Sequence, residues 1–345
     1  MPKISVIMGC YNGAAYLDEA IQSILGQHFG DFEFIIFDDA STDHTPGLLA
    51  RWADRDSRIR LLRNEKNLGL AASLNRALAV TRGQYIARMD ADDISLPERF
   101  SRQVALLDKG EVDLCGSWSR STGSHRSRIT RYPVSQKEIQ VHLFFQTAFS
   151  HPSIMATSAL YEKFRYNEQA GIAEDYDLWV RMAVRGARMA NIPEVLLLYR
   201  VHSEQVSESG RLTQAGYAAD VRKLYLEQSG MVLTPEEIFV ASRIRFAAPP
   251  DSREQVIATE KWLVRLAGIH GKEASTLRII ALEWYLYSLR ASVFGLWTWR
   301  KYRSSALSQS YNPGSRALAD LFFTCLVRLR YRSRLYNLIE RFSLS

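Results

Sequence analysis

Ile4-Ser5-Val6-Ile7-Met8 is an apolar run typical of a buried β-strand, and Gly9-Cys10-Tyr11-Asn12-Gly13 follows it directly. Residues 16–27 then place apolar side chains at the spacing of one helix face. A second strand is predicted at Phe34-Ile35-Ile36-Phe37, and a second helix from about Pro46. Further predicted elements are a strand at 59–62, a helix at 70–80 and a strand at 85–87. Strands that alternate with helices indicate an α/β fold, with a mostly parallel sheet covered by helices on both faces.

Polar residues follow three of the predicted strands at the point where each strand ends. They are Tyr11 after the first strand, Asp38 and Asp39 after the second, and Asp90-Ala91-Asp92-Asp93 after the strand at 85–87. Ligands of open parallel sheets bind beyond the carboxyl ends of the strands. We therefore expect the three clusters to lie on one rim, where ordinary turns are a poor explanation for all of them.

The acidic run after the strand at 85–87 predicts a metal–diphosphate site. Asp90, Asp92 and Asp93 repel one another and raise each other's pKa unless a cation or hydrogen-bond donors face them. A hard divalent cation prefers oxygen ligands and keeps coordination positions free for substrate phosphates. Aspartates also fill solvated turns, and that alternative stays open for the run taken by itself.

A series of motifs resembles those of family 2 glycosyltransferases, in particular bacterial members that build cell-surface polysaccharides. The motifs are Val6-Ile7-Met8-Gly9-Cys10-Tyr11-Asn12, Phe37-Asp38-Asp39-Ala40-Ser41-Thr42-Asp43, Asn67-Leu68-Gly69, Met89-Asp90-Ala91-Asp92-Asp93, His151-Pro152-Ser153, Ala173-Glu174-Asp175-Tyr176-Asp177-Leu178-Trp179 and Tyr199-Arg200-Val201-His202. The resemblance covers roughly residues 1–215, and the order of the motifs is more specific than any one of them. It implies an inverting enzyme with the Rossmann-like GT-A fold and a nucleotide-sugar donor.

The resemblance also implies roles for the acidic run. Asp92 matches the aspartate that holds a divalent cation, Mn²⁺ or Mg²⁺, which bridges the donor phosphates and neutralises the leaving group. Asp90 matches a residue that binds the ribose or helps to set the ion. Asp93 either supports the ligands or caps the helix expected near Pro97.

Recognition of the donor base is expected at the ends of the first two strands. Asp39 resembles the carboxylate that accepts the N3–H of a pyrimidine, which implies a UDP or dTDP sugar. Its neighbour Asp38 is the alternative candidate for this base-binding role. Tyr11 would stack on the base, unless it is a core tyrosine beneath the loop. Gly9-Cys10 departs from the family, where a Pro or Thr often precedes the Tyr, and we expect altered packing beneath the base.

The resemblance of residues 173–179 to the family's acceptor-side acidic motif implies that Asp175 is the catalytic base, which would deprotonate the acceptor hydroxyl. Its neighbour Glu174 would push a carboxyl pKa upward, whereas the start of the helix expected here would favour the charged form. The sequence does not decide between these effects. The alternative is that Asp175 and Asp177 are ordinary acidic residues of a first helical turn.

Two further residues near the strand predicted at 196–199 are candidates for the donor site. His202 matches a histidine that some related GT-A enzymes use as an additional metal ligand, and imidazole suits manganese better than magnesium, so His202 is a candidate ligand. Arg200 is a candidate donor-binding residue, because guanidinium matches phosphate oxygens. A structural role is about as good an explanation for each. His151 is expected to shape the acceptor pocket, and Arg88 and Arg76 are weaker phosphate candidates that solvated surface positions explain nearly as well.

The chain of 345 residues has room for a GT-A domain at 1–215 and a helical C-terminal region at 216–345. Its three cysteines are far apart and odd in number, which fits a reducing cytosol and argues against a disulfide framework. No signal peptide is recognised near the N-terminus. The longest apolar stretch, 279–299, is interrupted by Glu283 and Arg290, so a cytoplasmic location is expected.

The C-terminal region changes in character, because strand-like runs give way to helical periodicity, as at 255–267 and 273–289. Its end combines aromatic residues with Arg328 and four arginines beyond it. This composition predicts peripheral contact with anionic lipid on the inner face of the membrane, which would suit a lipid-linked acceptor. A helical cap or a self-association surface explains it equally well.

The predicted activity is inverting transfer of a hexosyl or deoxyhexosyl group to a hydroxyl of a saccharide or lipid-linked saccharide in polysaccharide biosynthesis. The alternatives to this activity are a nucleic-acid-binding protein and a sugar nucleotidyltransferase. The net charge of +7 would suit a nucleic-acid-binding protein, but no such motif is present and the expected rim is acidic, so no nucleic-acid partner is predicted. A sugar nucleotidyltransferase would need a Gly- and Arg-rich phosphate loop, of which Gly13-Ala14-Ala15-Tyr16 is a poor version.

Overall fold

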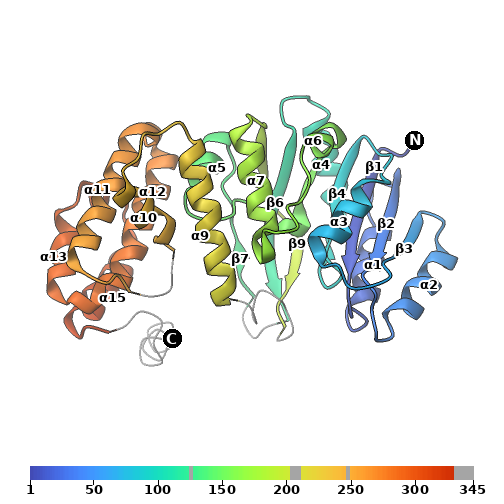
Figure 1. Ribbon diagram of the computed structural model, residues 1–345, viewed down its shortest axis with the longest axis horizontal. Coiled ribbons are helices and arrows are strands. Elements are labelled where there is room, and N and C mark those ends of the chain that lie inside the picture. The colour runs from blue at the N-terminus through green and yellow to red at the C-terminus, as the bar shows by residue number, and fades with distance from the viewer. Residues whose placement is uncertain (124–126, 203–210, 246–248, 330–345) are drawn as a thin grey trace. The chain divides into compact units, whose positions relative to one another are not determined.

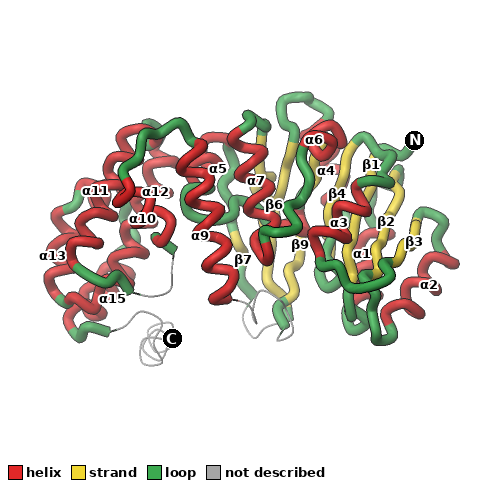
Figure 2. The backbone as a smooth tube through the Cα atoms, in the orientation of Figure 1, coloured by secondary structure: helices red, strands yellow, loops and turns green. Residues whose placement is uncertain are grey.

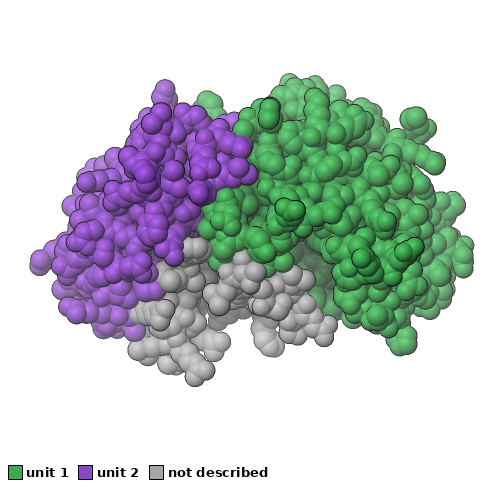
Figure 3. All heavy atoms as spheres, viewed as in Figure 1, with its two compact units in different colours: residues 1–139, 147–221 green, residues 140–146, 222–345 purple. Residues whose placement is uncertain are grey.

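The computed structural model describes residues 1–123, 127–202, 211–245 and 249–329. The chain divides into two compact units, of which the first comprises residues 1–139 and 147–221 and the second 140–146 and 222–345 (Figure 3). The boundary between a GT-A domain at 1–215 and a helical C-terminal region at 216–345 stays a prediction.

One sheet organises the first unit (Figures 1 and 2). Among the described residues it has nine strands, β1 (Ile4–Cys10), β2 (Phe32–Asp38), β3 (Ile59–Arg63), β4 (Tyr85–Arg88), β5 (Ile94–Ser95), β6 (Leu114–Thr122), β7 (Ile129–Thr130), β8 (Met155–Thr157) and β9 (Met189–Arg200). Their order is β3-β2-β1-β4-β8-β6-β9-β5, with β7 on β6. The predicted parallel arrangement is confirmed for β1 to β4. Beyond β4 the sheet is mixed, because β8 runs antiparallel to both β4 and β6.

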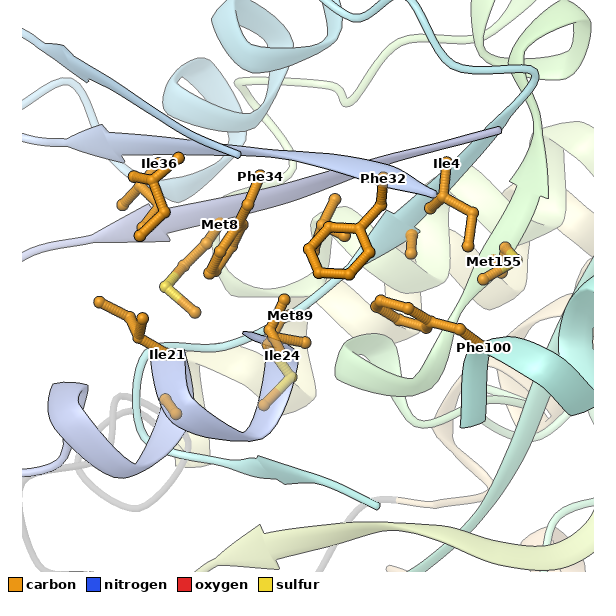
Figure 4. Close-up of a cluster of buried hydrophobic side chains, with 14 of the residues drawn as sticks. Ile4, Met8, Ile21, Ile24, Phe32, Phe34, Ile36, Met89, Phe100 and Met155 are labelled. Carbon is orange, nitrogen blue, oxygen red and sulfur yellow. The ribbon is translucent and has the colours of Figure 1, made fainter. Parts of the chain in front are cut away.

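Helices cover both faces of this sheet, as predicted. The helices of the first unit are α1 (Leu17–Leu25), α2 (Thr45–Arg55), α3 (Leu70–Leu78), α4 (Arg99–Leu107), the first part of α5 (Gln136–His142), α6 (Ser158–Lys163) and α7 (Glu174–Val184), with the short helices η1 (His151–Ser153) and η2 (Gly171–Ala173). Alternate residues of β1 and β2, such as Met8 and Phe34, point into a cluster with Ile21 of α1 and Phe100 of α4 (Figure 4). The opposite face of β1 lies against α3, where a side chain at Gly9 would meet Leu70.

The register of the parallel strands places the candidate residues on one rim. Cys10 pairs with Asp38, so β1 and β2 end at the same level, whereas Ile7 pairs with Arg88, so β4 ends three residues before the end of β1. The backbone amide of Met89 still donates to the carbonyl of Ile7 at 3.0 Å. The chain after β4 thus continues alongside β1 to the same rim, where a side chain at Gly13 would meet Ala91 at 3.5 Å.

The second unit is helical. Its elements are the C-terminal part of α9 (Arg211–Gln228), followed by α10 (Pro235–Arg243), α11 (Arg253–His270), α12 (Ala274–Arg290), η3 (Ala291–Phe294), α13 (Leu296–Ser304), α14 (Ala306–Ser310) and α15 (Ser315–Leu326). The predicted change to helices and both predicted helical segments are confirmed. Thr234 caps α10 in a capping box with Glu237, and Ser252 caps α11.

Two expectations about covalent and membrane structure can be compared with the described residues. Cys10, Cys115 and Cys325 are free and buried. Among the described helices, none combines the length and the apolar character that a bilayer crossing requires.

Candidate functional site

A cavity of about 780 Å³ opens at the rim where β1, β2 and β4 end. We call it the rim cavity, and all of its lining residues belong to the first unit. Its walls include most of the residues that the sequence singled out, namely Tyr11, Asp39, Asp90, Asp92, His151, Asp175 and His202. The structure thus brings together the three strand-end clusters and the acidic segment that begins α7.

Loops after β1 and β2 form one side of the rim cavity and hold each other. The side-chain oxygen of Asn12 accepts from the amide of Thr42 at 2.9 Å, and the amide of Asn12 donates to the hydroxyl of Ser41 at 2.9 Å. Asn12 and Ala40 have φ angles of 49° and 60°, in the left-handed region that non-glycine residues rarely adopt. Such backbone strain is found mainly at ligand sites, where the surrounding contacts hold it in place.

Tyr11 stands on this side of the rim cavity with 49% of its surface exposed. A core tyrosine beneath the loop would be buried, so that alternative is wrong. The exposed ring is available to stack against a planar ligand.

Asp39 lines the rim cavity, whereas Asp38 does not belong to its lining. One oxygen of Asp39 accepts from the Asn64 side chain at 2.7 Å and from the Leu68 amide at 2.9 Å, and the other accepts from the Gly69 amide at 2.8 Å. A carboxylate has about four acceptor positions, so Asp39 keeps one for a ligand donor. Asp38 instead accepts from the Ser41 amide at 3.0 Å and pairs with Arg63.

The aspartates after β4 form a tight acidic group. Asp90, Asp92 and Asp93 each have an oxygen within 4.8 Å of the others. Burial and the neighbouring carboxylates raise the pKa of Asp90 and raise that of Asp93 well above its ordinary value. Arg88, which is 2% exposed, forms an ion pair with Asp90 and opposes this rise. Arg88 is therefore no solvated surface residue, and the interpretation of it as one is wrong.

A backbone amide at the end of β9 donates a hydrogen bond to Asp93. Its Oδ1 accepts from the Arg200 amide at 2.8 Å, while its buried Oδ2 has no hydrogen-bond partner among the described residues. The alternative in which Asp93 caps the next helix is wrong, because α4 has Glu98 at its N-cap and no side-chain cap bond.

His202 and Arg200 lie next to the same aspartates but differ in where they point. His202 Nε2 is 2.9 Å from Asp92 Oδ2, and His202 lines the rim cavity. The Arg200 guanidinium binds the Asp92 carbonyl at 2.8 Å and Glu19 at 2.7 Å, and it lies over the Tyr16 ring. Arg200 is not part of the cavity lining, so the structure shows it holding the acidic loop, and its contact with a donor stays a prediction.

The acidic group fits a divalent cation. Three carboxylates offer oxygen atoms at one point, which suits hard cations such as Mg²⁺ and Mn²⁺. The unpartnered oxygen of Asp93 lies in this group, and His202 adds a nitrogen beside Asp92. Without a cation, the buried negative charges would be only partly compensated by Arg88.

A second acidic group lies at the start of α7. Burial, followed by the charge of Asp175, raises the pKa of Glu174 to about 7, and burial raises the pKa of Asp175. The Tyr176 amide at the helix start lowers the pKa of Asp175 without reversing the rise. Thr147 donates a long hydrogen bond of 3.5 Å to Asp175. Burial thus decides the balance that the sequence left open.

Two polar residues lie beside this second group, His151, which the sequence singled out, and Tyr166, which it did not. His151 shares a hydrogen bond of 2.8 Å with the Tyr166 hydroxyl, and its Nδ1 is 4.0 Å from Glu174. Burial and Arg88 hold the pKa of His151 well below its ordinary value, so the imidazole is neutral. A neutral histidine gives Glu174 no ionic partner, which is consistent with the raised carboxyl pKa. His151 was expected in the acceptor pocket because of its motif, but nothing in the pattern pointed to Tyr166.

Known glycosyltransferases resemble this chain in sequence. The family model described as Glycosyl transferase family 2 matches residues 5–164. The putative glycosyltransferase EpsE of Bacillus subtilis is 38% identical over 208 residues, which are 59% of this chain and 74% of EpsE. The O-antigen biosynthesis glycosyltransferase WbnJ of Escherichia coli is 32% identical over 214 residues, which are 61% of this chain and 84% of WbnJ.

Solved structures resemble a larger part of the chain. Staphylococcus aureus TarS 1–349 in complex with UDP-GlcNAc has a TM-score of 0.58 at 15% identity and covers 96% of this chain and 93% of its own. The mannosyltransferase PcManGT from Pyrobaculum calidifontis in complex with GDP-Man and Mn²⁺ has a TM-score of 0.56 at 19% identity and covers 90% and 85%. These likenesses concern the fold, and the expected GT-A architecture is confirmed.

Proposed function

This chain belongs to glycosyl transferase family 2, and we propose that it moves a hexosyl or deoxyhexosyl group from a UDP or dTDP sugar, with inversion, to an acceptor hydroxyl. The acceptor is a saccharide or a lipid-linked saccharide in polysaccharide biosynthesis, a role that the name of WbnJ suggests. The observation that carries the proposal is the rim cavity, which unites the exposed Tyr11 ring, the Asp39 carboxylate, the acidic group after β4 and the second acidic group.

Donor binding uses the strand ends. Tyr11 stacks on the base, and the remaining acceptor position of Asp39 takes the N3–H of uracil or thymine. Asp92, with Asp90 and His202, would hold a divalent cation. When bound, the cation supplies positive charge that stabilises the departing nucleoside diphosphate. The Mn²⁺ in the structure of PcManGT supports this choice of cofactor.

Sugar transfer uses the second acidic group. Asp175 accepts the proton of the acceptor hydroxyl as the hydroxyl oxygen bonds to the anomeric carbon. The bond from that carbon to the diphosphate oxygen breaks with its electron pair, and the nucleoside diphosphate leaves. A single displacement inverts the anomeric configuration. The raised pKa of Asp175 suits a base that must hold a proton after the transfer.

Cellular location is part of the proposal. Three free, buried cysteines fit the reducing cytoplasm. We therefore place the enzyme there, peripheral to the inner face of the membrane where a lipid-linked acceptor would be presented.

Thermal shift with nucleotides tests donor recognition directly. We expect UDP and dTDP to raise the melting temperature in the presence of Mn²⁺, and GDP and CMP to have much smaller effects. Equal shifts with GDP and UDP would contradict the role of Asp39. Release of a nucleoside diphosphate from the cognate sugar donor separates transfer from the rival nucleotidyltransferase reaction, which releases pyrophosphate.

A further inference from the structure

Five of the large hydrophobic residues that are exposed among the described residues gather on two neighbouring helices of the second unit, α13 and α15. They are Leu296, Phe322, Phe323, Leu326 and Val327. Phe323 and Leu326 are 45% and 50% exposed, which is unusual for side chains of this size in a packed helical unit. We call this set the apolar patch.

The apolar patch follows the outer face of α15. Exposed positions recur at Arg316, Ala319, Phe322, Phe323, Leu326 and Val327, which is the spacing of one helix face. The inner face holds Leu321, Thr324 and Cys325, which are buried. The helix therefore packs with one apolar face and presents a second one outward.

Contacts between α13 and α15 make the surface continuous. The Trp299 ring meets the Phe322 ring edge to face at 5.3 Å between centroids. At the end of α15, the Arg328 side chain lies against Gly295, where a side chain would come within 3.0 Å of Arg328 Nε. Leu296 follows Gly295 directly and joins the patch from the side of α13. Figure 1 shows these two helices side by side.

Arginines border the apolar patch. Arg300 and Arg303 are exposed on the same side of α13 as Leu296 and Trp299, and Arg303 lies 5.7 Å from the Trp299 ring. Arg316 and Arg328 are exposed near the two ends of α15. Within the described residues, neither Arg300 nor Arg316 has an acidic partner. Segment 291–328 contains five Arg or Lys residues and a single acidic residue, Asp320.

From this arrangement we propose that the apolar patch and its arginine border dock on an anionic phospholipid surface. Apolar side chains with aromatic rings would enter the boundary of the acyl chains, and the arginines would reach lipid phosphates. A second copy of this chain fits less well, because a two-fold contact would set the arginines of both copies against each other. The inference does not depend on which sugar or acceptor the enzyme uses.

Vesicle binding by the full chain tests the proposal. Vesicles of phosphatidylcholine alone are compared with vesicles in which about one lipid in three is phosphatidylglycerol. We expect the chain to float with the anionic vesicles, to bind the neutral ones weakly, and to be released by salt. Equal binding to both vesicle types, or no binding to either, would overturn the proposal.

Variants assign the binding to the patch. Phe323→Ser combined with Leu326→Ser should weaken binding to anionic vesicles by roughly tenfold or more. Arg300→Gln combined with Arg303→Gln should weaken it by roughly 25-fold, since each arginine at such a surface contributes about fivefold. All variants keep residues 330–345, so any contribution of that segment is common to them.

A matched control is available on another helix of the same unit. Phe239 on α10 is 46% exposed and lies 4.8 Å from Arg243, so Phe239→Ser removes a comparable aromatic residue outside the patch. It should bind vesicles as the wild type does, and all variants should keep the wild-type melting temperature. If Phe239→Ser loses binding as strongly as the patch variants, the assignment fails. Light scattering that shows a dimer which only the patch variants abolish would identify a self-association surface instead.

Discussion

The acidic group after β4 and the acidic group at the start of α7 share one cavity but differ in what compensates their charge. Asp90 has an ion pair with buried Arg88, and Asp92 has His202 beside it. Arg88 also lowers the pKa of Glu174, but among the described residues no direct ion pair joins them; His151 beside Glu174 is neutral, and burial raises the pKa of Glu174 to about 7. The first group gathers three carboxylates at one point, which suits a divalent cation, and the second is suited to exchange a proton. The difference teaches that clustered carboxylates with a direct cationic partner suit ion binding, whereas a buried carboxyl without a direct ion pair suits a base.

The largest expected effect separates the two groups by kinetics. Asp175→Asn should lower the rate of sugar transfer by roughly 10²–10⁴-fold and leave donor affinity nearly intact, because a general base acts on the acceptor in the transition state. Rates at saturating acceptor and calorimetry with the nucleoside diphosphate check this. Asp177→Asn is the matched control, because Asp177 lies in the same helical turn but pairs with Arg181 and does not line the rim cavity. Near-normal turnover of Asp175→Asn would contradict the assignment, as would a product with retained configuration.

For the acidic group after β4, we expect a substitution to weaken donor binding as well as turnover. Asp92→Asn should lose most turnover and also most Mn²⁺-dependent nucleoside-diphosphate binding, while the protein stays folded, because it removes an oxygen from the ion site. Calorimetry with and without Mn²⁺ measures the effect, and Asp54→Asn on the exposed side of α2 serves as control. Unchanged metal-dependent binding in Asp92→Asn would remove the distinction between the two groups.

Asp39 is a third carboxylate of the rim cavity, and it differs from both acidic groups because backbone amides and the Asn64 side chain compensate its charge. Asp39→Ala should weaken binding of UDP or dTDP by about 1.5–3 kcal/mol, the usual contribution of a hydrogen bond to a charged group. Asn64→Ala removes a partner of Asp39 without removing the carboxylate, so the loss should be smaller. If Asp38→Ala weakens binding and Asp39→Ala does not, the two neighbours have exchanged roles.

The smallest effect concerns the pH dependence of stability. Glu174 keeps its proton up to about pH 7 in the folded protein but releases it near its ordinary pKa of 4.5 in the unfolded chain. The folded state binds more protons between these values, so the free energy of unfolding should fall as pH rises from about 4.5 to 7, by at most about 3 kcal/mol. Glu174→Gln should flatten this slope and reduce sugar transfer less than Asp175→Asn does. Chemical denaturation across this pH range is the measurement, and an unchanged slope in the variant would contradict the raised pKa.

Sequence alone determined the alternation of strands and helices, and with it the rim on which Tyr11, Asp39 and Asp90 meet. Periodicity and strand ends are local properties, and parallel pairing of β1, β2 and β4 turns them into one edge. The mixed half of the sheet escaped prediction, because β8 is three residues long and owes its place to pairing with β4 and β6.

Tertiary structure alone decided the charges of the site. The burial of Arg88 depends on the elements packed around it, and no pattern near residue 88 encodes that. The pKa balance at Asp175 depends on burial outweighing the helix start, which requires atoms far apart in the sequence. Arg200 matched a motif, yet the fold directs its guanidinium to Glu19 and the Asp92 carbonyl. Residue type and spacing specify which groups can act, whereas desolvation and partners, which are properties of the packed chain, specify their charge and direction.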